Sequence, residues 1–273
     1  MPAAAISWPK TLVDFREYND LIVERHPRLT GALASIDGRN LACQTSEDEE
    51  IENATYNSWL CEQFVSSVLV FSPKGEFQDK YRPFVILNLT PGTVINAILN
   101  APGSWHDSRI ARPIYEKLRT RTPEGFYLVA DTAFPRGANQ IEGKIRAPIK
   151  SGQTIRGTSS AIQERMAFDR ELLSYRQTAE WGMRGLQGSF GRLRIPLEIR
   201  RQQERGDLLE ICVRLNNVRA EMVGINQIRS VYMPLWKETR EQEEIWSGFE
   251  KMVFSEQRRS DRVARFHNIA IYE

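Results

Sequence analysis

The sequence feature that most constrains the fold is the apolar run Phe126-Tyr-Leu-Val-Ala130, which is followed at once by Asp131. A continuous apolar run of this length is typical of a buried central strand. Runs rich in β-branched residues predict further strands over Leu33–Ile36, Phe64–Phe71 and Val94–Leu99. Asp131 is therefore expected at the carboxyl end of a buried strand, which is where open α/β sheets bind their ligands.

Four segments have the apolar spacing of helices. They are predicted over Leu12–Glu24, after Ser104, from about Ala161, and from Asp207 to about Ser230. The segment Ser104-Trp-His-Asp107 has the form of a capping box, with Ser104 as the expected cap. Pro113 is expected to divide the helix that follows into two pieces, because a proline in a helix lacks the N–H and clashes with the preceding turn.

The two long helices have expected buried faces, and a short strand is predicted over Ala147–Lys150 before the first of them. The earlier helix is expected to bury Leu172, Ala179, Met183, Leu186 and Phe190. The later helix is expected to bury Leu208, Ile211, Cys212, Leu215, Val218, Met222 and Ile225. The resulting order, one helix, three strands, a helix, two strands and two helices, predicts an α/β fold.

The composition excludes several classes of protein. Hydrophobic residues make up 41% and charged residues 26% of the 273 residues, and no apolar run approaches the roughly 18 residues of a membrane span. We therefore expect a soluble chain with no membrane partner, and its start lacks the pattern of a secretory signal. The three scattered cysteines favour a reducing compartment, and without a C-x-x-C pair a structural zinc site is not expected.

Three acidic residues that are far apart in the sequence have local settings that could direct their carboxylates to one point: Asp37, Asp131 and Glu180. Hard divalent ions take oxygen ligands, and two such ions can activate a water and stabilise the leaving oxygen of a phosphodiester. The three residues therefore indicate a metal-dependent nuclease. For Glu180 an alternative stays open, because Arg176 and Arg184 stand four residues before and after it, as in a surface ladder of ion pairs.

The net charge of +2 hides an uneven distribution. Ser46–Glu50 is acidic, whereas a later stretch is rich in arginine: Arg184, Arg192, Arg194, Arg200, Arg201 and Arg205. Such a cluster could form a basic patch that meets phosphates. The alternative is an ordinary solvated surface.

Four motifs occur in a fixed order along the chain. They are Asp37-Gly38, Asn100-Ala-Pro-Gly-Ser-Trp-His-Asp-Ser-Arg109, Leu128-Val-Ala-Asp-Thr-Ala-Phe134 and Thr178-Ala-Glu-Trp-Gly-Met-Arg-Gly-Leu-Gln-Gly-Ser-Phe-Gly-Arg-Leu193. Together they resemble the PIF/Harbinger-type DDE superfamily endonucleases, especially the versions abundant in fungal genomes. The resemblance covers roughly Phe15–Tyr232, and the ordered set is far more specific than any one motif.

The resemblance implies an RNase H-like fold: a mixed sheet of about five strands, of which the first three are antiparallel, flanked by helices. Asp37 would lie on the first strand, Asp131 at the end of the fourth, and Glu180 on the helix after the fifth. Together they would hold two Mg²⁺ or Mn²⁺ ions. A water would then attack a DNA phosphodiester, and in a transposase the freed 3′-hydroxyl would attack target DNA.

Other site residues follow from the same resemblance. His106 and Asp107 match the His-Asp-Ser motif of the family and would lie near the catalytic centre. The alternative for them is a capping role at a helix start, with a half-buried histidine. Arg184 and Arg192 would be candidate contacts to DNA phosphates.

The resemblance also bears on domains and partners. We expect an N-terminal helical extension over 1–30, the nuclease domain over 31–232, and a charged, partly helical tail over 233–273. About 30 residues precede the first catalytic strand, where the family usually has a DNA-recognition region, so a Myb-like partner could supply DNA binding. A second copy of the chain is another candidate partner, and the nucleus, with the cytoplasm as a second compartment, is the expected location.

The segment 77–93 differs from the tight connection that is usual in the family. We hypothesise a retained intron or a gene-model error, and we expect the segment to protrude from the strand hairpin, since loop closure becomes costlier only slowly with length. The alternative function is a decayed or domesticated transposase that keeps the fold as a DNA- or protein-binding module.

Overall fold

The structure is a computed structural model of the 273-residue chain, and it describes residues 2–74, 92–134, 141–150 and 157–222. The chain divides into two compact units, the first formed by Met1–Pro148 and Glu164–Ile225 and the second by Ile149–Gln163 and Asn226–Glu273. The predicted tail over 233–273 lies outside the described residues. No helix among the described residues is long and apolar enough to cross a membrane.

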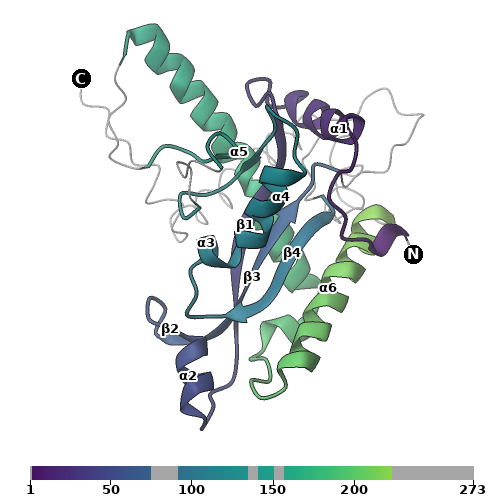
Figure 1. Cartoon of the computed structure of the whole chain (residues 1–273), viewed down its shortest axis with the longest axis vertical. Helices are drawn as coiled ribbons and strands as arrows, with labels where there is room; N and C mark the ends of the chain where they lie inside the picture. The colour runs from purple at the N-terminus through teal and green to yellow at the C-terminus, as the bar shows by residue number, and fades with distance from the viewer. Residues whose placement is uncertain (1, 75–91, 135–140, 151–156, 223–273) are drawn as a thin grey trace, which may run out of the picture. The chain divides into compact units, whose positions relative to one another are not determined.

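The centre of the first unit is a mixed sheet with the strand order β4-β3-β1-β5-β6 (Figure 1). Strands β1, β3 and β4 form an antiparallel set, and β5 and β6 continue the sheet in parallel with β1. The short β2 pairs with β3. The strands are β1 Ala32–Ala42, β2 Tyr56–Asn57, β3 Glu62–Phe71, β4 Val94–Pro102, β5 Tyr127–Val129 and β6 Ile145–Arg146.

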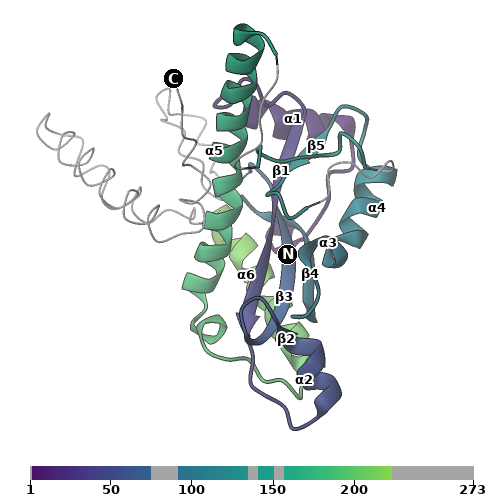
Figure 2. The ribbon, with the colours of Figure 1, turned by 90° about the vertical axis from the view of Figure 1, so that its left-hand side faces the viewer.

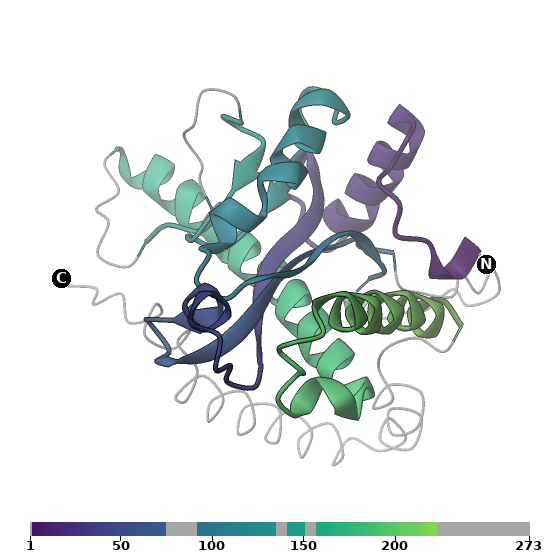
Figure 3. The same ribbon diagram turned by 60° about the horizontal axis from the view of Figure 1, so that its bottom comes forward.

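Helices cover both faces of this sheet, as the views from the side and from below show (Figures 2 and 3). Strand β1 and its neighbours pack on one face against α1, α3 and α4, and on the other face against α5 and α6. The helices are η1 Pro2–Ala4, α1 Leu12–Val23, α2 Glu49–Thr55, α3 Asp107–Ile110, α4 Arg112–Thr120, α5 Ser159–Ser189, η2 Gly191–Arg194 and α6 Gln202–Met222. The predicted α/β class, with helices flanking a mixed sheet, is confirmed.

The alternation of β1 explains how one strand serves both faces. Ala34 and Ile36 belong to the core beneath α1, α3 and α4, whereas Leu41 belongs to the core beneath α5 and α6. Successive side chains of a strand point to opposite faces, so Ser35, Asp37 and Arg39 share the α5 face with Leu41. By the same alternation, a side chain at position 38 would point to the face covered by α3.

Local signals in the sequence set the helix boundaries. The Thr11 hydroxyl accepts a hydrogen bond from the Asp14 N–H at 3.2 Å, and the Asp14 carboxylate accepts one from the Thr11 N–H at 2.9 Å, a reciprocal cap at the start of α1. Pro113 does divide its helix, because it lies in the first turn of α4, directly after α3. The predicted cap at Ser104 is wrong: α3 begins at Asp107, and its cap is His106.

The hairpin between β3 and β4 closes where its strands end. The Ser72 N–H donates to the Thr93 carbonyl at 3.0 Å, and the Thr93 N–H donates to the Lys74 carbonyl at 2.8 Å. Residues 75–91, which make up most of the hypothesised insertion, lie outside the described residues. The chain therefore leaves and re-enters the sheet at one place, next to a shift in the β3–β4 register between Val70 and Phe71.

The predicted buried face of α6 is wrong in part: Cys212 is buried as predicted and Leu208 packs against the core, while Ile225 lies outside the described residues. Ile211, Leu215 and Met222 are 54%, 49% and 62% exposed, and the face toward the sheet consists of Arg205, Leu209, Cys212, Val213, Asn216, Asn217 and Ala220. Asn217 explains the difference, because its side chain accepts from the Val94 N–H at 2.7 Å and donates to the Val94 carbonyl at 2.8 Å. A polar residue that bonds a strand edge is buried here in place of an apolar one.

The predicted strand over Ala147–Lys150 is also wrong in position. The strand observed is β6, which covers Ile145–Arg146 and ends two residues before Pro148. Proline has no N–H to donate to a sheet ladder, which is consistent with the end of β6 before Pro148.

Candidate active site

The strand register brings two of the three predicted acidic residues together. Ser35 of β1 is the parallel partner of Val129 of β5. Two residues further along each chain stand Asp37 and Asp131, so the same register places them at one level beside each other. Neighbouring strands are about 4.8 Å apart. The carboxyl end of the parallel pair therefore carries two adjacent aspartates, as the apolar run before Asp131 predicts.

Helix α5 is held against β1 on both sides of Asp37. The Ser35 and Thr178 hydroxyls are hydrogen-bonded at 2.9 Å, and Arg39 donates to the side-chain carbonyl of Gln187. Because Asp37 lies between Ser35 and Arg39 on the same strand face, it faces the part of α5 between Thr178 and Gln187. That part contains Glu180.

A close approach of helix and sheet fixes the same stretch of α5. A Cβ atom at Gly182 would lie 2.4 Å from Cε1 of Phe71, whose ring is fully buried. Only glycine allows the helix to approach β3 this closely. Phe71 is also the antiparallel partner of Ser35. The Ser35–Thr178 hydrogen bond and the contact of Gly182 with Phe71 therefore hold α5 at paired positions of the adjacent strands β1 and β3.

A fourth carboxylate reaches the aspartates from the opposite face of the sheet. A Cβ atom at Gly38 would lie 2.4 Å from Cγ of Asp107, so the Asp107 carboxylate packs directly on the Gly38 backbone. Asp107 is the first residue of α3. The structure thus gives a physical reason for two motif residues, since any larger residue at 38 would displace Asp107.

The aspartates are also oriented by main-chain donors. The Ala133 N–H donates to Oδ1 of Asp131 at 2.7 Å, and the Gly38 N–H donates to Oδ1 of Asp37 at 2.9 Å. Each of these carboxylates keeps its other oxygen for further contacts. Each aspartate is therefore oriented by a main-chain N–H within two residues of it.

Burial and mutual repulsion perturb the acidic residues. The pKa of Asp37 is raised to about 7, first by burial and then by the negative charges of Asp131 and Glu180, while the positive charge of Arg176 partly offsets them. Burial, followed by the charge of Asp131, raises the pKa of Asp107 to about 6. Asp131 is the common neighbour, so the four carboxylates form one electrostatically coupled cluster, hereafter the acidic cluster.

Glu180 is paired with a basic residue inside this cluster. Nη2 of Arg176 lies 2.5 Å from Oε1 of Glu180, and the two side chains are only 12% and 22% exposed. The ion pair expected from the spacing is present, but it is not on the open surface. Arg184, the other arginine of the predicted ladder, is exposed.

His106 caps α3 and is exposed rather than half-buried. One ring nitrogen accepts from the Ser108 N–H at 3.3 Å, and the same nitrogen lies 2.9 Å from the Ser108 hydroxyl. The preceding residue, Trp105, is 37% exposed and stacks against the Arg109 guanidinium at 3.9 Å. The capping role is thus observed, and it leaves the imidazole at the surface next to Asp107.

The arginine-rich stretch does not form one uniform patch. Arg205 is buried and donates to the Asn100 side chain and to the carbonyls of Glu198 and Ile199 at 2.6–2.8 Å, so its role is structural. Arg192 is exposed and donates to the Pro196 carbonyl at 3.0 Å. Arg184 and Arg192 stay candidates for phosphate contacts, whereas Arg205 does not.

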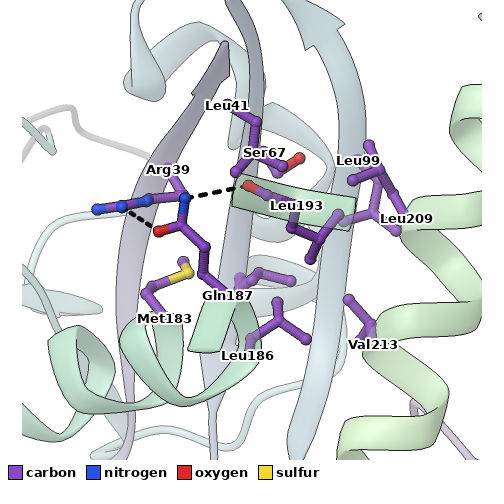
Figure 4. A pocket seen from close by; sticks show the side chains of 11 residues that line it. Arg39, Leu41, Ser67, Leu99, Met183, Leu186, Gln187, Leu193, Leu209 and Val213 are labelled. Carbon is purple, nitrogen blue, oxygen red and sulfur yellow. Dashed lines mark hydrogen bonds between the residues drawn. The ribbon is translucent and has the colours of Figure 1, made fainter. Parts of the chain in front are cut away.

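A small apolar cavity lies further along α5, beneath Arg39 and Gln187 (Figure 4). Its volume is about 20 Å³, enough for no more than a single water. Within the described ranges, Nε of Arg39 is buried without a hydrogen-bond partner. The cavity is a packing gap between β1, β3, α5 and α6, and the candidate active site is the acidic cluster beside it.

The chemistry of the acidic cluster fits a hard divalent cation, although its side chains do not form a finished ligand set. Carboxylate oxygens are the ligands that Mg²⁺ and Mn²⁺ prefer, and a cation would offset the repulsion that raises the pKa of Asp37 and Asp107. Yet no group of three or more His, Cys, Asp or Glu residues in the described part of the chain is arranged to hold a metal ion. Glu180 is instead engaged in the ion pair with Arg176.

Comparison with known protein families gives a match over the middle of the chain. Residues 83–217 match the family model described as DDE superfamily endonuclease, and these 135 residues are just under half of the 273-residue chain. This stretch of the chain is therefore similar to the DDE superfamily endonucleases. It includes His106, Asp107, Asp131 and Glu180, and it begins after Asp37. No curated protein and no solved structure matches the chain.

Sequence reasoning did not identify several residues that build this site. Arg39, Ser35 and Thr178 fix α5, and none of them stood out in the sequence. For Arg39 a signal was present, because it follows Asp37 by two residues and must share its strand face. The contact between Gly38 and Asp107 joins two motifs about 70 residues apart, and only the folded chain reveals it.

Proposed function

We propose that this protein is a metal-dependent DNA endonuclease of the PIF/Harbinger type, with an RNase H-like fold. The observation that carries the proposal is the parallel register of β1 and β5, which puts Asp37 and Asp131 side by side, with Glu180 close enough to raise the pKa of Asp37. The strand order and the antiparallel set of β1, β3 and β4 support the RNase H-like assignment.

In this proposal Asp37, Asp131 and Glu180 hold two Mg²⁺ or Mn²⁺ ions. When bound, the ions supply activation of a water and charge stabilisation of the leaving oxygen of a DNA phosphodiester. The chain itself keeps the two aspartates aligned through the Ala133 and Gly38 N–H groups. Rigid orientation of this kind is what a site needs to hold its ligands in productive geometry.

The remaining residues are assigned around the DNA. His106 stands exposed beside Asp107, where it can contact a phosphate, and Asp107 borders the acidic cluster from the α3 side. Arg184 and Arg192 are proposed to contact the backbone of DNA. In a transposase the 3′-hydroxyl freed by cleavage would go on to attack target DNA. A Myb-like protein or a second copy of the chain would supply site recognition in the nucleus.

The test is nicking of supercoiled plasmid by the purified chain with Mg²⁺ or Mn²⁺. Asp37→Asn, Asp131→Asn and Glu180→Gln keep the shape of each side chain and should each abolish nicking. Glu210→Gln is the matched control, because Glu210 forms an ion pair with Arg214 at the same helical spacing on the exposed face of α6. Nicking that survives all three substitutions would refute the proposal.

A wild-type chain that does not nick DNA, even with a Myb-like partner, would favour the alternative function. The protein would then be an inactive or domesticated transposase that acts as a DNA- or protein-binding module. Measuring DNA binding together with nicking on the same samples distinguishes an active endonuclease from a binding module that does not cut.

A further inference from the structure

Arg176 acts on two carboxylates of the acidic cluster. Its guanidinium forms the 2.5 Å ion pair with Glu180, and its charge acts on Asp37. At 12% exposure it is largely withdrawn from solvent. By comparison, Arg214 in its pair with Glu210 is 44% exposed, so the Arg176 pair differs from an ordinary helical surface pair.

The position of this pair follows from how α5 is held. The Ser35–Thr178 hydrogen bond and the close contact at Gly182 fix the helix on either side of Glu180. Arg176 and Glu180, four residues apart, lie on one face of the helix, where the two side chains can meet. The four carboxylates are only partly exposed, and the positive charge of Arg176 offsets part of their mutual repulsion.

We propose that Arg176 is an internal counter-ion that holds Glu180 in the metal-free protein and is displaced when Glu180 binds a divalent cation. The inference rests on the proposed function, in which Glu180 is a metal ligand. Guanidinium and cation would compete for the same carboxylate, and the two positive charges repel each other. Arg176 is therefore a positioning residue: it keeps Glu180 in place and lowers the affinity of the empty site for its cation.

The first experiment measures Mn²⁺ affinity by titration calorimetry at pH 8, above the pKa of about 7 of Asp37, so that protons do not compete for the site. Arg176→Gln should bind Mn²⁺ about tenfold more tightly than wild type, which corresponds to about 1.4 kcal/mol. Arg176→Lys, which keeps the charge, should stay close to wild type. Arg214→Gln is the matched control and should leave the affinity unchanged.

The combination with Glu180→Gln makes the measurement specific. In the Glu180→Gln background, Arg176→Gln should no longer tighten Mn²⁺ binding, because its partner is gone. Equal or weaker binding by Arg176→Gln, beside a wild type that binds Mn²⁺, would overturn the inference and leave the proposed metal site intact. An absence of Mn²⁺ binding in wild type would overturn both.

A second experiment uses the wild-type chain and so does not depend on the folding of any variant. Arginine modification by phenylglyoxal, read by peptide mass spectrometry, should be slow at Arg176 without metal and several-fold faster with saturating Mn²⁺. Arg214 serves as the internal reference and should react at one rate in both conditions. An Arg176 rate that is unchanged or slower with Mn²⁺ would overturn the inference.

Discussion

The two long helices on the same face of the sheet, α5 and α6, reach their positions by different means. Helix α5 buries an apolar face and is tied to β1 by the polar contacts of Thr178 and Gln187, on either side of Asp37. Helix α6 instead buries Arg205 and Asn217, which bind main-chain groups, and leaves Ile211 at the surface. The difference suggests that α5 positions chemistry, whereas α6 completes the edge of the sheet.

The largest effect on stability is expected from Asn217→Ala in α6. The substitution leaves the Val94 N–H and carbonyl buried without their partner, and the free energy of unfolding should fall by about 4 kcal/mol, since each orphaned group costs about 1–3 kcal/mol. Urea unfolding followed by circular dichroism measures it. Leu215→Ala, at a 49% exposed site of the same helix, should change stability by less than about 1 kcal/mol. Equal losses in the two variants would contradict the assigned packing of α6.

The corresponding change in α5 is Gly182→Ala. Its Cβ would lie 2.4 Å from the ring of Phe71, so helix and strand must separate, and a loss of about 3 kcal/mol is expected. Gly188→Ala is the matched control on the same helix, because nothing lies within 4 Å of its Cβ, and it should gain up to about 1 kcal/mol. Unlike Asn217→Ala, Gly182→Ala should also reduce DNA nicking under conditions in which the protein is fully folded. Full nicking activity of the folded Gly182→Ala variant would show that the position of α5 does not affect the site.

The acidic cluster that faces α5 should make stability depend on pH. The pKa of Asp37 is raised from 3.8 to about 7, so the folded state binds its proton more tightly, and stability is lost as pH rises from about 4 to 7. Asp37→Asn should therefore stabilise the metal-free protein at pH 8 by about 2 kcal/mol while abolishing nicking. Thermal unfolding of both proteins across pH 4–8 tests this.

Asp14 in α1 should make stability depend on pH in the opposite direction. Hydrogen bonds from the Thr11 and Lys10 N–H groups lower its pKa, so its contribution is present at neutral pH and is lost as pH falls below the usual range of aspartate. Asp14→Asn should destabilise the protein at neutral pH, where Asp37→Asn stabilises it. Destabilisation by both substitutions would show that Asp37 is not in a repulsive environment.

The smallest effect is expected from Gln187→Ala. It removes the contact with Arg39 and the 3.1 Å bond to the Leu193 carbonyl, for a loss of about 1 kcal/mol and a several-fold slower nicking rate. Gln203→Ala in α6 removes a comparable exposed bond to Asp207 and should alter neither quantity. If both variants nick equally well, α5 is not positioned through Gln187.

Much of the architecture could be predicted from local patterns. The apolar strand runs and the apolar stripe of α5 predicted these elements correctly, because the buried residues concerned are apolar. The stripe consists of Leu172, Ala179, Met183 and Leu186. The face of α6 could not be predicted, since Asn217 and Arg205 are buried by virtue of partners distant in sequence. The choice between Ser104 and His106 as the cap of α3 likewise depends on backbone conformation, which the motif does not contain.

For the candidate site, the residue types, their local settings and the family resemblance predicted Asp37, Asp131 and Glu180, and the register of β1 with β5 agrees with the approach of the two aspartates. Whether they bind metal stays a prediction. Sequence spacing also revealed the Arg176–Glu180 pair, but not its burial, because burial depends on Ser35 and Phe71 across the sheet. A spacing of four residues describes a surface pair and a buried pair equally well.

The closed base of the β3–β4 hairpin has a consequence for engineering and for evolution. Because Ser72 and Thr93 are bonded to each other, the codons between Lys74 and Gly92 can be lengthened, shortened or exchanged in frame without moving the strands on either side. An affinity tag inserted in frame between these residues is therefore expected to leave the pairing of β3 with β4 in place. In a gene, the same closed base is a position where in-frame changes in splicing are expected to be tolerated.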